Sequence, residues 1–382
     1  MFLPPLEVPL ARFLVTTLAS ITWAVARNTD ESCKLAQGYD HQKHLEYIEI
    51  KCDKLDIDKS IMRMWSMKGN SVTEVAWNNI ELLYDEKNQK IVFNAGGFPG
   101  KYKRLQEILF TKYTRYTFAR GFAIEAYRKE EENKQVGGFI DFSLKGSIPF
   151  LFGLNTLRRK LRTVYENKVV NILLGDLGDR SLALKEAVSA LYSPTITNNT
   201  GKVSISKPIE RLGIKLPPQK LGVDINTFIV YSLQLKIVSN ILQGSIELVS
   251  RWPTISIAIY KAGGRGQGDD TRPLNIITVD SEEVFATLEG IRASAEDIGA
   301  EPLRLANGLT SMLNCVYELA RRGEHDTNTA SALLSHGTPL IDSLMRGFVD
   351  RDLHYHVIRL LESISQKRGV PPQCIKALHS LA

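Results

Sequence analysis

The periodicity of the sequence changes near residue 280, and this change limits the folds that the chain can adopt. Short apolar runs rich in β-branched residues recur between residues 203 and 279, separated by polar turns, which is typical of strands in an antiparallel sheet. From Ser281 onward the apolar residues have helical spacing, Pro302 begins a helix, and glycines follow the expected helix ends. We therefore predict a β-rich middle followed by an all-helical C-terminal quarter.

The chain of 382 residues is long enough for two or three domains, each with a buried core. We expect an α+β protein with a central antiparallel β-sandwich of jelly-roll type, an N-terminal mixed region and a C-terminal helical bundle. The apolar run over residues 227–238 is assigned to a strand of this sandwich. The expected domains are an N-terminal mixed region over 1–100, a basic segment with the β-sandwich over 101–280, and a helical domain over 281–382.

An apolar run of 14 residues covers positions 13–26 and ends in Ala-Val-Ala. It is shorter than the roughly 20 residues that a membrane-spanning helix needs. A buried first helix is the most frequent explanation of such a run, and a cleaved signal peptide or a helix covered by a membrane surface or a partner are the alternatives. No other stretch is expected to cross a membrane, and residues 28–60 are polar and show no regular period.

The cysteines are few and widely spaced, which favours free thiols in a reducing compartment over a disulfide framework. The four positions are Cys33, Cys52, Cys315 and Cys374.

Two of these cysteines, Cys33 and Cys52, flank His41 and His44, and thiolate and imidazole are ligands that zinc accepts. The C-x7-H-x2-H-x7-C spacing differs from that of short-loop zinc sites, so unconnected polar residues are the favoured interpretation, and we expect neither a metal nor a cofactor. The helical segment His354-Tyr355-His356 is also a poor metal site, because positions i and i+2 of a helix face different directions.

Most of the basic character of the chain lies in residues 101–168. This segment holds 15 Lys or Arg against 7 Asp or Glu, whereas the whole chain has a net charge of +6. Aromatic residues alternate with the cations, which suits phosphate neutralisation and base stacking on single strands. The alternative is a solvated helix with its aromatic residues packed inward and with Glu130-Glu131-Glu132 at its end. The expected nucleic-acid contacts are Lys101, Lys103, Arg104, Lys112, Arg115, Arg120, Arg158, Arg159, Lys160 and Arg162.

The sequence holds no G-x-S-x-G, H-E-x-x-H, Walker or C-x-x-C motif, so we expect no enzyme activity.

One sequence pattern, a tripeptide and a distant glycine, resembles the motif of a known family. Leu177-Gly178-Asp179 is followed 65 residues after its aspartate by Gly244, which opens a predicted strand. This arrangement resembles the L-x-D…G pattern of the 30-kilodalton superfamily of plant-virus movement proteins and covers about residues 165–262. The resemblance implies a β-sandwich that binds single-stranded nucleic acid without sequence preference. It also implies homo-oligomers or tubules, contact with host membranes or plasmodesmal proteins, and a place in the host cytoplasm, at the membrane periphery or in plasmodesmata.

These observations support three hypotheses. The leading one is a viral movement-type protein that binds single-stranded nucleic acid and aids cell-to-cell transport. The second is a viral coat or nucleocapsid-type structural protein, because a β-sandwich with a helical domain also suits a shell subunit. The third is a secreted binding module or enzyme with a cleaved leader.

Overall fold

The structure is a computed structural model of the whole chain. It describes residues 9–41, 45–55, 160–175, 181–197, 202–217, 224–245, 252–263 and 273–382, with short pieces at 3, 57, 64, 84–85, 90–91, 128–131, 134–137, 157 and 221–222.

The chain divides into two compact units and passes from one to the other three times. Unit 1 consists of Met1–Arg211 and Pro253–Thr278, and unit 2 consists of Leu212–Trp252 and Val279–Ala382.

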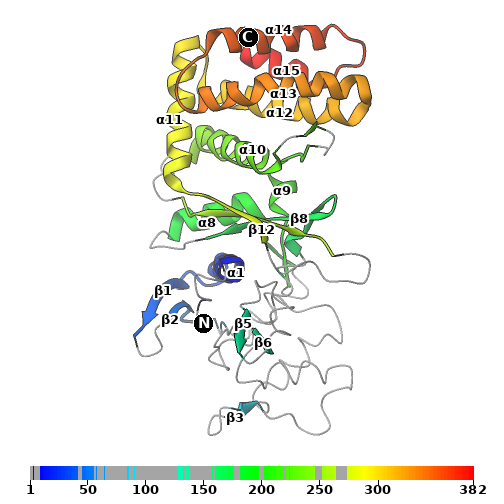
Figure 1. Ribbon diagram of the computed structural model, residues 1–382. Helices are drawn as coiled ribbons and strands as arrows, with labels where there is room; N and C mark the ends of the chain where they lie inside the picture. Colours follow the sequence, from blue (N-terminus) through cyan, green and yellow to red (C-terminus); the bar gives the residue numbers. More distant parts are fainter. Residues whose placement is uncertain are drawn as a thin grey trace. The chain divides into compact units, whose positions relative to one another are not determined.

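The centre of unit 1 is a four-stranded sheet with the order β12-β11-β8-β7 (Figure 1). Strands β11 and β7 run antiparallel to β8, with Ile255 opposite Leu174 at one end of the β11–β8 pair and Lys261 opposite Lys168 at the other. Both β8 and β11 are buried on both faces, which explains why both are continuous apolar runs. The prediction of strands between residues 203 and 279 is confirmed at β11. The strand bounds are Thr163–Tyr165 for β7, Lys168–Leu174 for β8, Ile255–Lys261 for β11 and Pro273–Val279 for β12.

Helix α1 (Pro9–Arg27) packs against β8 and α8 (Ser181–Tyr192). Every residue from 14 to 26 is buried, so the prediction of a buried first helix is confirmed. Two threonines join the helix to the last residue of β8. Thr17 Oγ1 accepts a hydrogen bond from the Leu174 amide at 2.8 Å, and Thr16 Oγ1 donates to the Leu174 carbonyl at 2.6 Å. The N-terminal run therefore forms part of the core of unit 1.

A hairpin of β1 (Lys34–Asp40) and β2 (Leu45–Lys51) follows α1, where no regular structure was expected. The signal for it lies in β2, where Ile48 and Ile50 are buried on one face of the strand. In β1, Gly38 lies under the ring of Tyr47, and a Cβ atom at this position would come within 2.6 Å of that ring. The expectation of irregular structure was wrong. Apolar and polar residues alternate in β2 alone, so the sequence signal for a hairpin was weak.

The described residues of unit 1 form three further antiparallel pairs of strands. The backbone of Arg128–Glu131 forms a strand, so the expected helix end at Glu130 and Glu131 was wrong. Helix α9 (Pro208–Arg211) packs against α8 and β8. The strand pairs are β3 (Tyr84–Asp85) with β4 (Lys90–Ile91), β5 (Arg128–Glu131) with β6 (Lys134–Gly137), and β9 (Thr195–Thr197) with β10 (Lys202–Ser204).

Unit 2 is helical, as predicted for the C-terminal quarter (Figure 1). Helix α12 packs against α10, α11, α13 and α15, while α14 packs against α13 and α15. Gly290 allows α11 to approach the backbone of Met345 at the end of α13. The helix bounds are Ile225–Asn240 for α10, Ser281–Ile298 for α11, Pro302–Arg322 for α12, Glu324–Met345 for α13, Arg351–Ser365 for α14 and Pro372–Leu381 for α15.

Helix α10 occupies the run that was assigned to a strand, so that assignment was wrong. Its first turn is capped by Asp224, whose carboxylate accepts hydrogen bonds from the amides of Asn226 and Thr227. The density of β-branched residues misled the prediction, because burial of α10 on most of its surface outweighs a strand propensity of a fraction of a kcal/mol per residue. A run of 16 residues is also long for a strand.

Residues Ile225–Gly244 form the one described helix that is long and apolar enough to cross a membrane, contrary to the expectation that no such stretch exists beyond the N-terminal run. Core helices meet the same criteria, and 61% of the most apolar 18-residue window is buried within the protein.

The described residues thus form a mixed α+β protein with antiparallel strand pairs and helices in the C-terminal half. The closed jelly-roll sandwich that was expected is not shown. The reason is that α10 lies where one of its strands was placed, and the principal described sheet has four strands.

Replacing Thr17 by valine tests how α1 is held. The variant leaves the buried Leu174 amide without its acceptor, so we expect a loss of about 1–3 kcal/mol in the free energy of unfolding. Urea unfolding followed by circular dichroism measures this loss. The matched control is Thr310→Val in α12, which removes a hydrogen bond made only within its own helix and is expected to cost less than about 0.5 kcal/mol. Equal losses in the two variants would contradict the account of α1.

Candidate functional site

The basic segment was the first candidate for a functional site, and two of its ten predicted contact residues lie in the described part of the chain. Lys160 is half-buried, and its Nζ donates a hydrogen bond to the Val203 carbonyl of β10 at 2.7 Å. Burial lowers the pKa of its ammonium group. Arg162 also has an interaction partner. Lys160 therefore makes a structural contact within unit 1, and its contact with phosphate stays a prediction.

The other predicted contacts lie outside the described residues and stay predictions. They are Lys101, Lys103, Arg104, Lys112, Arg115, Arg120, Arg158 and Arg159.

The family motif is described only at its glycine. Leu177 and Asp179 lie outside the described residues, whereas Gly244 lies in a π-helical turn, Ile241–Ser245, that continues α10. Its φ of 141° is a backbone conformation that favours glycine. Gly244 therefore lies at a kink that follows α10 and not within a described strand. Residues 246–251, which hold most of the strand predicted to begin at Gly244, lie outside the described residues, so this strand stays a prediction.

The four cysteines form two disulfide bonds, so the prediction of free thiols was wrong. Cys33 pairs with Cys52 in unit 1, and Cys315 pairs with Cys374 in unit 2. The spacing misled the prediction because each bond joins segments that only the fold brings together. Cys33 precedes β1 and Cys52 follows β2, so the first bond closes the hairpin, while the second joins α12 to α15.

The possible zinc site at Cys33 and Cys52 is excluded by the first of these bonds, because oxidised sulfurs cannot act as thiolate ligands. His44 lies outside the described residues, and His41 is exposed and packs edge-on against Tyr39.

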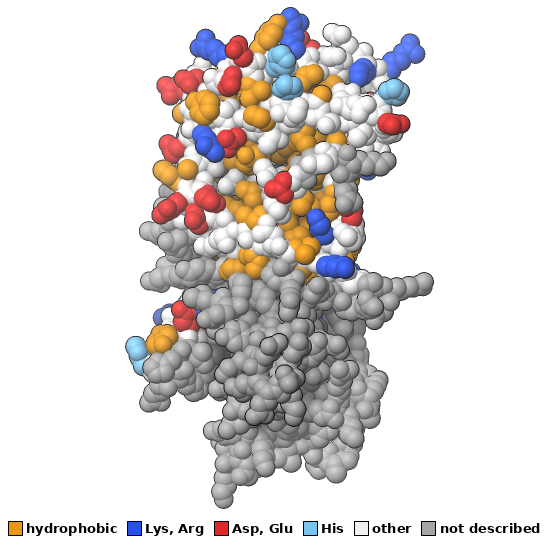
Figure 2. Space-filling model, in the orientation of Figure 1, with side chains coloured by type: hydrophobic (Ala, Val, Ile, Leu, Met, Phe, Trp, Pro, Cys, Tyr) orange, Lys and Arg blue, Asp and Glu red, His pale blue; other side chains and the backbone are white. Residues whose placement is uncertain are grey.

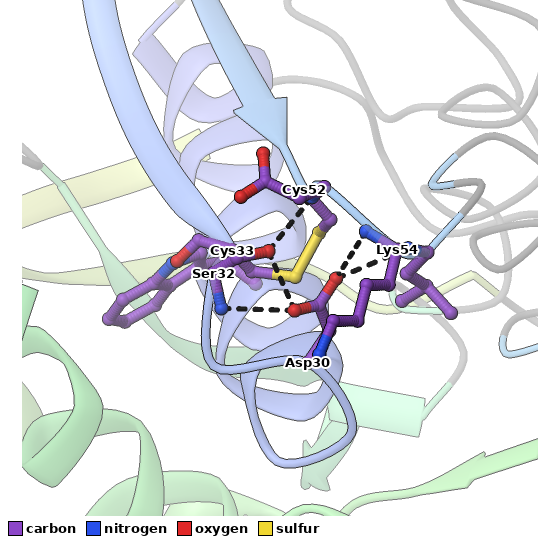
Figure 3. The surroundings of a disulfide bond; sticks show 8 residues. Asp30, Ser32, Cys33, Cys52 and Lys54 are labelled. Atoms are coloured by element: carbon purple, nitrogen blue, oxygen red, sulfur yellow. Dashed lines mark hydrogen bonds between the residues drawn. A yellow bond between two sulfur atoms is a disulfide. The ribbon is translucent and has the colours of Figure 1, made fainter.

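Asp30 lies beside the Cys33–Cys52 bond and organises the turns around it (Figure 3). One carboxylate oxygen accepts hydrogen bonds from the Ser32 amide at 3.0 Å and the Ser32 hydroxyl at 2.6 Å. The other oxygen accepts from the amides of Lys54 at 2.9 Å and Leu55 at 3.2 Å. These bonds, above all the one from the Ser32 side chain, lower the pKa of Asp30 to about 2. The carboxylate therefore has a structural role, since it joins the turn at Ser32 to the segment that follows Cys52.

A pocket of about 420 Å³ opens in unit 2 among α10, α12, α13 and the residues that precede α10. Mainly apolar groups line it, and the apolar side chains come from all of these segments: Leu221, Phe228, Leu313, Leu334 and Pro339. Pockets of this size and lining are the usual sites for small ligands.

Hydroxyl groups form the polar part of this pocket, from Thr227, Tyr231, Ser331, Ser335 and Thr338. The hydroxyl of Tyr231 donates a hydrogen bond to Asp342 at 3.3 Å, and burial followed by the charge of Asp342 raises the pKa of Tyr231. The carboxylate of Asp224 caps α10. None of the described residues that line the pocket is Lys, Arg or His, so it suits a neutral or cationic molecule better than an anion.

Sequence reasoning missed this pocket because its residues lie on separate helices between positions 221 and 339. Its one regular signal is the recurrence of Ser331, Ser335 and Thr338 along one side of α13, which also occurs on ordinary solvated helices. Figure 2 shows hydrophobic side chains gathered over the helices of unit 2, with charged side chains around them.

Comparison with known proteins finds no matching family model, no matching curated protein and no matching solved structure. The resemblance to plant-virus movement proteins therefore stays a prediction.

Neutralising Asp30 tests its role at the disulfide. Because its pKa in the folded protein lies below the ordinary value near 4, its carboxylate stabilises the fold above that value, and this contribution is lost as the pH falls toward 2. We expect Asp30→Asn to be less stable than the original protein at pH 7. The difference should shrink between about pH 4 and pH 2. Urea unfolding at several pH values measures both effects.

The control for this experiment is Asp53→Asn, a nearby exposed aspartate. A stability difference for Asp30→Asn that stays constant from pH 7 to pH 2 would contradict the proposed role of the carboxylate.

Proposed function

We propose that the protein is a disulfide-bonded binding protein whose helical unit takes up a small, mainly apolar molecule. The pocket among α10, α12 and α13 carries this proposal. Its apolar lining favours burial of a hydrocarbon or aromatic group, and its hydroxyls favour a ligand with a hydrogen-bonding group. The absence of a cation among the described residues that line it favours a neutral or positively charged ligand.

The two disulfide bonds support a place of action in an oxidising compartment, because reducing compartments keep such thiols unpaired. This proposal develops the hypothesis of a secreted binding module. It places the protein in an oxidising compartment, whereas the leading hypothesis from the sequence placed it in the host cytoplasm. That hypothesis of a secreted module included a cleaved leader over the N-terminal run. In this proposal the run is kept as α1, because its side chains form part of the core of unit 1.

A neutral fluorescent probe tests the pocket. N-phenyl-1-naphthylamine brightens in apolar surroundings, and we expect a saturable rise in its fluorescence with the full-length protein. Ser331 is exposed and lines the pocket, so Ser331→Phe fills the space without removing a core side chain. We expect this variant to bind the probe at least about tenfold more weakly, equivalent to about 1.4 kcal/mol.

The matched control is Asn328→Phe, which places the same side chain at an exposed position of α13 outside the pocket. This control should bind the probe as the original protein does. Absence of saturable binding, or equal affinities in the two variants, would contradict the proposal.

A second candidate function is the binding of single-stranded nucleic acid by a movement-type or coat-type viral protein. The excess of eight positive charges in residues 101–168, interleaved with aromatic residues, favours it. Self-association and contact with host membranes or plasmodesmal proteins belong to this same proposal. Tubules or membrane pelleting would favour the movement type, and regular particles in electron micrographs would favour the coat type.

A gel-shift with single-stranded RNA at two salt concentrations tests this second function. Replacing Lys112, Arg115 and Arg120 by alanine should weaken binding and reduce the salt dependence by about two units of slope, because each phosphate contact contributes about 0.7. A control with the same loss of charge replaces Arg351, Arg368 and Lys376, which are exposed residues of unit 2. No binding at low salt, or equal effects of both triple variants, would refute it.

A further inference from the structure

Two histidines from neighbouring helices of unit 2 lie against each other. His336 is on α13 and His356 is on α14, and these helices pack together. The centroids of the two imidazole rings are 5.1 Å apart, with an angle of 52° between the ring planes. His356 is exposed and His336 is half-buried, so solvent reaches the pair.

This separation matches the requirement of a shared metal ion. A nitrogen ligand lies about 2.1 Å from tetrahedral zinc, which places the centroids of two bound imidazoles about 5 Å apart.

The surroundings favour a cation at this pair. Asp352 lies one helical turn before His356, on the same side of α14, and it is exposed. Arg359, the basic residue of α14 closest in sequence to His356, donates hydrogen bonds to the Tyr355 hydroxyl at 2.7 Å and to Glu362. His354 lies on a different side of α14 from His356, and its Nε2 is hydrogen-bonded to the Leu381 carbonyl at 2.8 Å.

We propose that His336 and His356 form a binding site for a divalent transition-metal cation of the zinc, nickel and copper group, which imidazole ligands select over magnesium and calcium. A metal bound here joins α13 to α14 and stabilises unit 2, because binding to the folded state alone raises its stability. The site differs from the pocket and does not depend on the function proposed for it.

The test uses the untagged full-length protein with zinc or nickel chloride. We expect saturable binding by isothermal titration calorimetry and an unfolding temperature that rises with metal concentration, whereas magnesium chloride has neither effect. His356→Ala changes an exposed residue, and we expect it to weaken metal binding at least tenfold. His336→Ala should have the same effect, and its circular dichroism spectrum shows whether it folds.

The matched control is His325→Ala, an exposed histidine on the same helix as His336. This control should bind zinc as tightly as the original protein. The proposal is overturned if the original protein shows no saturable binding below about 1 mM metal, or if His356→Ala and His325→Ala bind it equally.

Discussion

A disulfide bond in each compact unit is the constraint on which the rest of the structure depends. The Cys33–Cys52 disulfide closes the β1–β2 hairpin beside Asp30. Trp23 of α1 donates a hydrogen bond to the Cys33 carbonyl, and this hydrogen bond links the closed hairpin to the first helix. Cys315–Cys374 holds the short terminal helix α15 against α12. Sequence separations of 19 and 59 residues correspond to about 3 and about 4 kcal/mol of stabilisation in the chain-entropy treatment. The proposal of an oxidising compartment follows from these same bonds.

The parts of the fold that could be predicted are those in which local pattern and tertiary environment agree. Strands β8 and β11 are short, apolar and buried on both faces, and α11 begins at a capping aspartate, Asp280, and ends at Gly299. Helix α10 was mistaken for a strand because its β-branched residues favour strands locally, while burial among the other helices of unit 2 determines its state. The pairing of the cysteines could not be derived from their spacing, because it depends on which segments pack together.

The candidate sites were still less predictable than the fold, because each is assembled from residues on different helices. The pocket combines Phe228 of α10 with Leu313 of α12 and Leu334 of α13. His356 was considered with its sequence neighbour His354, but α14 turns these two side chains apart, and α13 supplies His336 instead. The basic segment differs from these sites, since its signal lies in the sequence itself, as an excess of cations interleaved with aromatic residues.

Disulfide mapping tests the central claim most directly. The thiols are blocked with an alkylating agent at the moment of lysis or collection, and the unreduced protein is then digested and analysed by mass spectrometry. The structure predicts two linked peptide pairs, Cys33 with Cys52 and Cys315 with Cys374, and no alkylated cysteine. Four alkylated cysteines, or linked peptides with any other pairing, would contradict the structure of both units and the proposed compartment.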